Sequence, residues 1–332
     1  MKEFTESRPR PPVPTSVSEP ARRFLATALD AFGNMAPPED IRDAAGWRQF
    51  FDKADASMIA RLGAAQPGSP TLERGEFELD GVRTYVLRPD GVPDSRETPV
   101  YLDFHGGGMV MGAGEAGLVQ LMPAARARDM ITWAVDYRMP PSHPYPAALD
   151  DGIAVYRKAL GERDPRDIFV GGASAGANLA AALLLRAKDE GLPMPAALVL
   201  LSPAVDLTES GDTFNTLLGV DYMVPVMTYN LLYAGDHDLA DPYLSPLFGD
   251  VRGFPPTFLQ SGTRDLLLSN TVRMHRKLRA AEVEAELHVW EAMPHGSFGG
   301  GTAEDAEVVA ETLRFLARHR MPRPVASAGE PA

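Results

Sequence analysis

The sequence predicts an α/β fold with a mostly parallel central sheet and helices on both of its faces. Along most of the chain, short apolar segments alternate with longer segments in which apolar residues recur at helical spacing. Several apolar segments lead directly into loops rich in glycine, serine, histidine or aspartate. In a parallel sheet such loops gather at the carboxyl edge of the strands, where this fold class places its sites.

The order of the elements supports this fold class. The predicted strands cover residues 100–104, 131–135, 168–170, 197–201, 257–259 and 287–290. The predicted helices of the core lie near residues 147–160, 175–189, 269–281 and 303–318. An antiparallel hairpin over residues 77–88, with its turn at Asp80-Gly81, precedes them.

Two further helical regions fall outside this alternation. Two amphipathic helices are expected between about residues 18 and 65, and a helical stretch bearing Met and Tyr interrupts the core from Asp206 to about Asp236. Together they could form a cap over a site, although packing on the flank of the domain explains the N-terminal helices equally well. The predicted organisation is a flexible arm, N-terminal cap helices, core, cap insertion, core and disordered tail, at residues 1–16, 17–70, 71–205, 206–236, 237–321 and 322–332.

Composition narrows the classes of function. The chain has 332 residues, which is enough to bury a sizeable core, and a formal net charge of −13 that argues against a nucleic-acid or anionic-membrane partner. It has no cysteine, so disulfides, thiolate metal sites and a cysteine nucleophile are excluded. No apolar run resembles a signal peptide or spans a bilayer, which predicts a cytoplasmic protein without a membrane partner.

Ser174 lies in the most informative stretch of the chain. Residues 172–176 read Gly-Ala-Ser-Ala-Gly, which fits GxSxG, and a predicted strand precedes them while a predicted helix follows. Glycines permit the tight, strained turn that raises a serine hydroxyl above a sheet, and the helix start favours negative charge beside it. In this context Ser174 is predicted to be a nucleophile, whereas an isolated motif of this kind could be a simple turn.

A run of three glycines, Gly106 to Gly108, follows His105 directly after a predicted strand. Backbone N–H groups without side chains around them suit an oxyanion hole, and His105 is expected to anchor the loop rather than to act as a base. Residues 112–117 also fit GxGxxG, and Asp136 ends the next strand, as in a dinucleotide site. Nicotinamide binding is nevertheless disfavoured, because the turn directly after the strand already holds His105 and its glycines.

The base is predicted from its loop. Among the seven histidines, His295 lies in a turn-rich loop directly after the strand at 287–290, where a βα loop would reach the catalytic edge. Packing or surface positions suffice for His275 and His319, which lie on predicted helices, and for His288, which lies inside a strand.

The acid is predicted to be Asp265. It directly follows the strand at 257–259, and one helix and one strand separate it from His295, so the two should occupy adjacent loops. Three other carboxylates precede His295 in a loop-like region, namely Asp236, Asp238 and Asp241. The chain order serine, aspartate, histidine is the order of an α/β-hydrolase triad.

As an ordered set, these motifs resemble the hormone-sensitive-lipase-like family of bacterial esterases over about residues 75–320. The matching segments are His105–Gly108, Asp136–Arg138, His143–Asp151, Gly172–Gly176, Asp241–Leu247, Gly262–Asp265 and Pro294-His295. The resemblance implies an α/β-hydrolase fold with a helical cap made from the N-terminal segment and the insertion. It also implies oxyanion donors from the backbone N–H groups of Gly106, Gly107 and Ala175.

The sequence departs from the family pattern at the elbow and in one loop. Ala173 and Ala177 stand where the family usually has aspartate and glycine, and Pro140 to His143 replace an Ala-Pro-Glu-His stretch. Neither departure removes a triad residue.

The sequence therefore predicts a serine carboxylesterase that hydrolyses small esters of short- to medium-length acyl chains. The predicted enzyme needs no metal and no cofactor, and it is expected to be a monomer or a homodimer. Lactones, amides and carbonates undergo the same addition, so a lactone or amide hydrolase is the alternative. A small-molecule receptor of the same fold would be expected to lack the catalytic histidine, which this chain retains.

Overall fold

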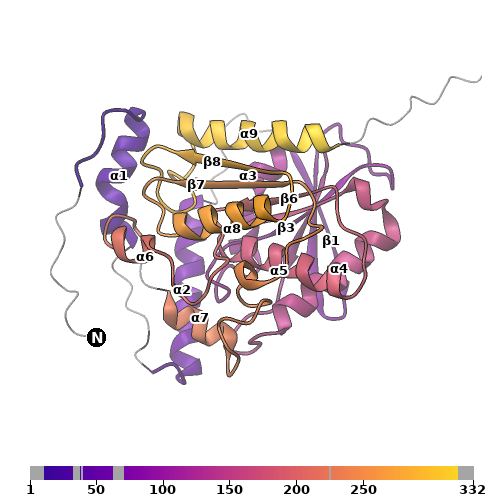
Figure 1. Cartoon of the computed structure of the whole chain (residues 1–332), viewed down its shortest axis with the longest axis horizontal. Coiled ribbons are helices and arrows are strands. Elements are labelled where there is room, and N and C mark those ends of the chain that lie inside the picture. Colours follow the sequence, from indigo (N-terminus) through magenta and orange to yellow (C-terminus); the bar gives the residue numbers. More distant parts are fainter. Residues whose placement is uncertain (1–10, 33–37, 39, 63–70, 224–225, 321–332) are drawn as a thin grey trace, which may run out of the picture.

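A twisted sheet runs through the centre of the computed structural model, which describes residues 11–32, 38, 40–62, 71–223 and 226–320 (Figure 1). Within these residues the sheet has eight strands in the order β1-β2-β4-β3-β5-β6-β7-β8, and all neighbours from β4 to β8 are parallel. The strands are β1 Leu72–Leu79, β2 Val82–Pro89, β3 Val100–Phe104, β4 Ile131–Asp136, β5 Ile168–Ala173, β6 Ala197–Leu201, β7 Thr257–Gly262 and β8 Ala285–Trp290. The predicted fold class is therefore confirmed.

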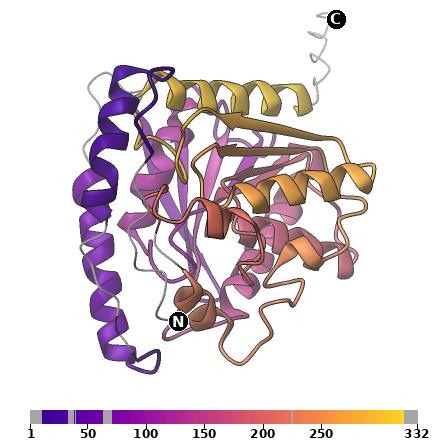
Figure 2. The same cartoon turned by 60° about the vertical axis from the view of Figure 1, so that its left-hand side comes forward.

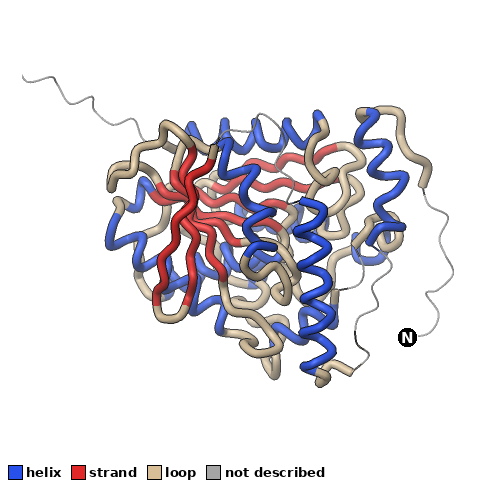
Figure 3. Tube along the Cα trace, turned by 180° about the vertical axis from the view of Figure 1, so that it is seen from behind, coloured by secondary structure: helices blue, strands red, loops and turns tan. Residues whose placement is uncertain are grey.

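Helices cover both faces of the sheet, as the view from behind also shows (Figure 3). One face carries α4 Ala147–Glu162, α5 Ala175–Asp189 and α8 Leu268–Ala280. The other carries α3 Glu115–Ala127 and α9 Ala303–His319. Short 3₁₀ helices, η1 Pro165–Asp167 and η2 Pro246–Phe248, lie in the connections.

A hydrophobic core lies on each face of the sheet, and the strands contribute residues to both because successive side chains point to opposite faces. In β3, Leu102 and Phe104 join the core under α4 and α5, whereas Tyr101 joins the core under α9. Residues of β3 are fully buried on both sides. This explains why the sequence of β3 is apolar on both faces rather than on alternate residues, except for Asp103, which is buried in an ion pair with Arg128.

The predicted hairpin forms between β1 and β2, which pair antiparallel with Leu79 opposite Val82. The two turn residues have positive φ, 52° at Asp80 and 81° at Gly81. A two-residue turn with positive φ at both positions matches the right-handed twist of the strands it joins, and Asp-Gly is well suited to it.

Several elements differ from the sequence prediction. Strands β1, β7 and β8 are longer than the predicted ranges, β1 and β8 at their starts and β7 at its end. Helix α3 was not predicted, because its sequence starts within the glycine motif and contains Pro123, which obscures the helical pattern. Strand β5 runs on to Ala173 instead of ending at residue 170, because its pairing with β3 and β6 extends through the glycines.

The helices outside the core gather at one side of the molecule. Helices α1 Glu19–Phe32 and α2 Ala44–Leu62 lie together along that side (Figure 2). The insertion contributes α6 Thr213–Thr216 and α7 Met227–Ala234. Five residues from α2, the loop after β3, and α7 pack as one group, called here the cap aromatic cluster: Trp47, Phe50, Phe51, Val110 and Tyr229.

This packing joins α2 to the insertion. The proposed boundaries of the cap segments remain predictions. Of the predicted arm, residues 11–16 are described, and the Pro12 carbonyl accepts a hydrogen bond from Arg264 Nη2 at 2.7 Å. Residues 1–10 of the arm and the predicted tail at 322–332 lie outside the described residues.

Candidate active site

Ser174 stands on the turn between β5 and α5, at the carboxyl edge of the sheet. Its φ is 56° and its ψ is −117°, a conformation that a residue with a side chain adopts only when its surroundings enforce it. The surrounding hydrogen bonds do so: Ser174 N–H donates to the Leu201 carbonyl at 2.8 Å, and the Ser174 carbonyl accepts from Asn178 and Ala204. The turn therefore projects the hydroxyl away from the sheet.

The two glycines of the elbow are required by close approach. A Cβ on Gly172 would lie 2.5 Å from the Phe104 carbonyl oxygen, and a Cβ on Gly176 would lie 1.9 Å from the same atom. Only glycine lets α5 start this close to β3. Ala177, one of the departures from the family pattern, is fully buried in the core, so its methyl group is accommodated there.

Three predicted residues from three loops come together at this edge. His295 Nε2 lies 2.9 Å from Ser174 Oγ, and His295 Nδ1 lies 3.0 Å from Asp265 Oδ1. With its proton on Nδ1, the imidazole donates to the carboxylate and leaves Nε2 free to accept from the serine hydroxyl. The geometry is that of a nucleophile, a base and an orienting acid.

Asp265 is held as an ionised acceptor. It is wholly buried, and its carboxylate accepts hydrogen bonds from Ser261 Oγ at 2.7 Å and from the Leu267 N–H at 2.9 Å. Burial acts to raise the pKa of Asp265, but the neighbouring His295 charge and these hydrogen bonds outweigh it and lower the pKa. Burial likewise acts to lower the pKa of His295, while the charge and hydrogen bond of Asp265 raise it above its ordinary value.

The glycine run after β3 lies directly beside the elbow. A Cβ on Gly106 would lie 3.5 Å from Ser174 Cβ and 3.2 Å from the Ala173 carbonyl oxygen. Gly107 has φ 132° and its carbonyl accepts from Val110 and Met111 N–H groups, which folds the loop into a tight turn. Any side chain at Gly107 would collide with the Met111 carbonyl, 2.1 Å from an added Cβ. The backbone at Gly106 thus lies next to the serine, and Gly107 shapes the turn that follows it.

His105 lies beneath this loop, as predicted, and not at the reacting serine. It is buried, stacks on Tyr137 with ring centroids 4.2 Å apart, and its Nδ1 lies 2.9 Å from the Gly106 carbonyl oxygen.

The GxGxxG motif makes room for this histidine. A Cβ on Gly112 would lie 2.6 Å from His105 Nδ1, and one on Gly117 would lie 3.0 Å from His105 Cδ2. Asp136, which a dinucleotide site would use for a ribose, instead accepts a hydrogen bond from the Gly114 N–H at 2.9 Å. The motif is therefore part of the support for the loop after β3.

Other aspartates and histidines that the sequence offered as acid or base have different contacts. Asp241 accepts from the Tyr243 N–H at 2.8 Å and forms a turn, as its sequence context suggested, and Asp238 caps the neighbouring turn at Ala240. His288 stacks on Phe258 within the sheet layer.

The sequence did not predict the residues that hold the histidine loop. Ser202 Oγ, at the end of β6, accepts a hydrogen bond from the Gly296 N–H at 3.1 Å. Asp221 and Tyr222, from the insertion, bind the backbone of His295 itself. No local pattern in the sequence marks these residues, because each acts on a partner far along the chain.

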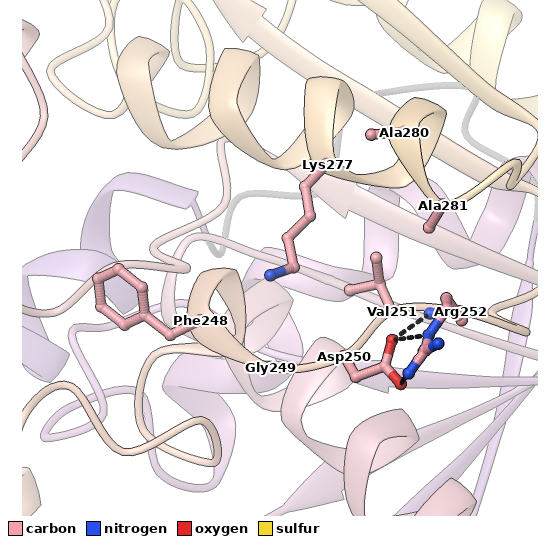
Figure 4. A pocket seen from close by; sticks show the side chains of 8 residues that line it. All are labelled: Phe248, Gly249, Asp250, Val251, Arg252, Lys277, Ala280 and Ala281. Carbon is pink, nitrogen blue, oxygen red and sulfur yellow. Dashed lines mark hydrogen bonds and ion pairs between the residues drawn. The ribbon is translucent and has the colours of Figure 1, made fainter.

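A separate surface hollow of about 440 Å³ lies between the C-terminal end of α8 and residues 248–252 (Figure 4). Asp250 in its wall is bound by Arg252 and by Lys188, and the Arg252 hydrogen bonds hold its pKa well below the ordinary value. None of its lining residues belongs to the three loops above. Across the described ranges there is no group of three or more His, Cys, Asp or Glu residues arranged to hold a metal, and no helix there has the length and apolarity to cross a membrane.

The order of the strands and the helices on both faces of the sheet are those of an α/β hydrolase. A family model described as "alpha/beta hydrolase fold" matches residues 101–299, so the chain belongs to that family. An esterase of Acinetobacter venetianus is 33% identical over 258 residues, which cover 75% of this chain and 83% of that relative.

Solved structures place the chain more narrowly. The crystal structure of esterase E25 has a TM-score of 0.81 and 34% identity, covering 94% of this chain and 98% of its own. An esterase described as from the bacterial hormone-sensitive lipase family has a TM-score of 0.77 and 29% identity, covering 92% and 99%. The chain is thus a member of the hormone-sensitive-lipase-like esterases, as its motifs indicated, and its enzyme class is that of the carboxylic-ester hydrolases.

Proposed function

We propose that this chain is a serine carboxylesterase that hydrolyses small esters of short or medium acyl chains through an acyl-enzyme. The observation that carries the proposal is the hydrogen-bonded series Ser174, His295 and Asp265, which starts on a strained turn beside a glycine loop. That series has the parts that acyl transfer through serine requires.

In the acylation step, Ser174 Oγ attacks the acyl carbon while His295 Nε2 takes the hydroxyl proton. The imidazolium that forms lies against the buried carboxylate of Asp265, which keeps the ring oriented and stabilises its charge. His295 then gives the proton to the departing alcohol. In the second half, His295 activates a water molecule that attacks the acyl carbon, releases the acid and restores Ser174.

The tetrahedral oxyanion is assigned to three backbone donors, the N–H groups of Gly106, Gly107 and Ala175. Gly106 is adjacent to the serine, and Ala175 is the first residue of α5, whose N–H has no partner within the helix. Rigid N–H donors stabilise charge that develops only in the transition state, which lowers the barrier rather than tightening substrate binding. No metal or cofactor takes part in the proposed cycle.

The acyl preference is inferred from the cap aromatic cluster. Tyr229 lies against the loop after β3, where a Cβ on Gly108 would meet its ring at 3.1 Å. Trp47 and Phe51 pack with it, and all three are at least nine-tenths buried. Aromatic rings beside the oxyanion loop favour an apolar acyl group, and their dense packing limits its length. A cytoplasmic location and a monomeric or homodimeric state complete the proposal.

The test is a panel of aryl esters with acetyl, butyryl, hexanoyl, octanoyl and dodecanoyl groups, assayed beside lactones, amides and carbonates. We expect kcat/KM to be highest for one of the shorter esters and to fall steeply at dodecanoyl. An aryl phosphonate should label Ser174 stoichiometrically in the intact protein, as read by mass spectrometry. Higher kcat/KM for a lactone or an amide than for every ester would overturn the proposed substrate class.

A further inference from the structure

Two consecutive residues of the insertion hold the backbone of His295 from both sides. The Asp221 carboxylate lies 3.3 Å from the His295 N–H through each of its oxygens, and the Tyr222 hydroxyl donates a hydrogen bond to the His295 carbonyl. Both polar groups of the histidine backbone are thus bound by side chains from the same segment, 73 and 74 residues away in the chain.

The same carboxylate also binds the loop of the triad acid. Asp221 Oδ2 accepts a hydrogen bond from the Leu266 N–H at 2.7 Å, and Leu266 directly follows Asp265. Asp221 is only 1% exposed, so its hydrogen bonds are not exchanged for water. One buried side chain from the insertion therefore connects the loops that carry the base and the acid.

Asp221 places a second buried carboxylate near the imidazole. Burial raises the pKa of Asp221 to about 6, with a further increase from the charge of Asp265, while the His295 charge and backbone N–H groups act to lower it. In turn, the charge of Asp221 adds to that of Asp265 in raising the pKa of His295. An imidazolium is therefore favoured by two carboxylates, one hydrogen-bonded to the ring and one to the backbone.

Three further side chains face His295 besides that of Asp221. Ser174 faces His295 from the elbow, Asp265 from the loop after β7, and Tyr222 from the insertion. Tyr222 in turn experiences the charges of Arg61 on α2 and Asp305 on α9.

We propose that Asp221 is a positioning residue for the hydrolysis, which sets the place of the His295 imidazole through its backbone and stabilises the cation that forms there. This inference rests on the proposed function. It assigns the insertion a part in the chemistry itself: one of its side chains holds the base in register with the acid. Because the Asp221 contacts run to the backbone, they act on the position of the ring and not on the substrate.

The insertion offers a matched control in Asp206. It is also 1% exposed and lies in the same segment, but its carboxylate binds Thr208, Ser210 and Arg273 and none of the triad loops. The comparison of Asp221→Asn with Asp206→Asn therefore separates loss of a buried carboxylate from loss of its contact with His295.

For Asp221→Asn we expect kcat on the best ester of the panel to fall by on the order of 10²-fold with little change in KM, because a small displacement of the base misaligns proton transfer. The acidic limb of the kcat/KM profile should move to lower pH, because a negative charge near His295 is removed and the pKa of the imidazole falls. Asp206→Asn should leave the limb in place and kcat within about threefold, since substitutions away from a site rarely perturb it. An unchanged limb in Asp221→Asn overturns the proposal even if kcat falls, because a merely structural residue would produce that result.

A second variant and a second readout keep the test decisive. If Asp221→Asn does not fold, Asp221→Ser removes the same charge and the same contacts with the His295 N–H in a smaller side chain. A shift of the acidic limb to lower pH in that variant supports the proposal, and an unmoved limb overturns it. The pKa of His295 can also be read from labelled imidazole resonances in intact wild-type and variant protein. That readout needs no turnover, so failure of the proposed esterase function leaves this inference separately testable.

Discussion

The elbow at Ser174 and the loop at His295 meet at one edge of the sheet, but they are held there in different ways. The elbow depends on its own strand and helix and on the adjacent strand, with glycines that permit close contact with Phe104. The histidine loop has little regular structure and takes its shape from distant residues: Ser202, directly after β6, and Asp221 of the insertion.

Helix α1 adds a further support to the histidine loop. Phe24 packs edge-on against Phe298 and Tyr222, with ring centroids 6.2 Å and 6.0 Å apart, and Ser18 binds Glu304 at the start of α9. The difference teaches that the Ser174 turn is held by the core alone, whereas the His295 loop is held by the core together with helix α1 and the insertion. Variants in the two regions should therefore fail in different ways.

The largest effect is expected at the elbow. Ser174→Ala should reduce kcat by on the order of 10⁶-fold, as seen when a serine hydrolase loses its nucleophile, because no other group can form the acyl-enzyme. The melting temperature should stay close to that of the wild type, since the turn and its backbone hydrogen bonds do not need the hydroxyl. Substantial turnover by folded, uncontaminated variant would show that another residue is the nucleophile.

The acid loop gives the next effect. Asp265→Asn should lower kcat by roughly 10⁴-fold, the loss known for the equivalent change in a serine protease, because an amide favours the wrong tautomer of His295. Asp241→Asn is the control and should keep kcat within about tenfold, since Asp241 only forms a turn. The reverse ranking of the two variants, measured by steady-state kinetics, would move the acid to Asp241.

A change in the cap aromatic cluster should affect stability and specificity but spare the nucleophile. Trp47 is fully buried and its indole donates to the Asp40 carbonyl, so Trp47→Ala should lower the free energy of unfolding by about 3–5 kcal/mol in urea titrations. The void next to Tyr229 should also shift the acyl preference towards longer chains, while phosphonate labelling of Ser174 persists.

The control for that variant is Ile41→Ala, whose side chain is 38% exposed and should cost less than about 0.5 kcal/mol. Loss of phosphonate labelling in folded Trp47→Ala would show that the position of Ser174 depends on the cap aromatic cluster.

The smallest effect concerns Asp55, through which α2 holds the loop next to the glycine run. Its carboxylate accepts from the Gly112 N–H at 2.8 Å, and burial raises its pKa to about 6. The folded-state pKa lies above the unfolded value of about 3.9, so ionisation costs the folded protein stability as pH rises through 6. The melting temperature of Asp55→Asn relative to the wild type should therefore rise between about pH 4 and about pH 8. If the difference in melting temperature between Asp55→Asn and the wild type did not change with pH, ionisation of Asp55 would not destabilise the folded protein.

The sequence by itself determined the sheet, the hairpin and the three residues that meet at its edge. Each of these signals is local: an apolar run ends and a loop with Ser174, Asp265 or His295 begins, and the geometry of parallel strands carries all such loops to one edge. Helix α3 was missed because Pro123 and the glycines at its start weaken the periodic pattern.

Only the tertiary structure decided how the base is held and what the GxGxxG motif does. Asp221, Tyr222 and Ser202 bind the loop of His295 across separations of 73 to 94 residues, and Gly112 makes room for the ring of His105. A contact of this kind depends on which surfaces the folded chain brings together, and one isolated aspartate in an insertion carries no periodicity or spacing to announce its partner. The physical reason is that strand and turn geometry follow from neighbouring residues, whereas a buried hydrogen bond between distant segments exists only once both have packed.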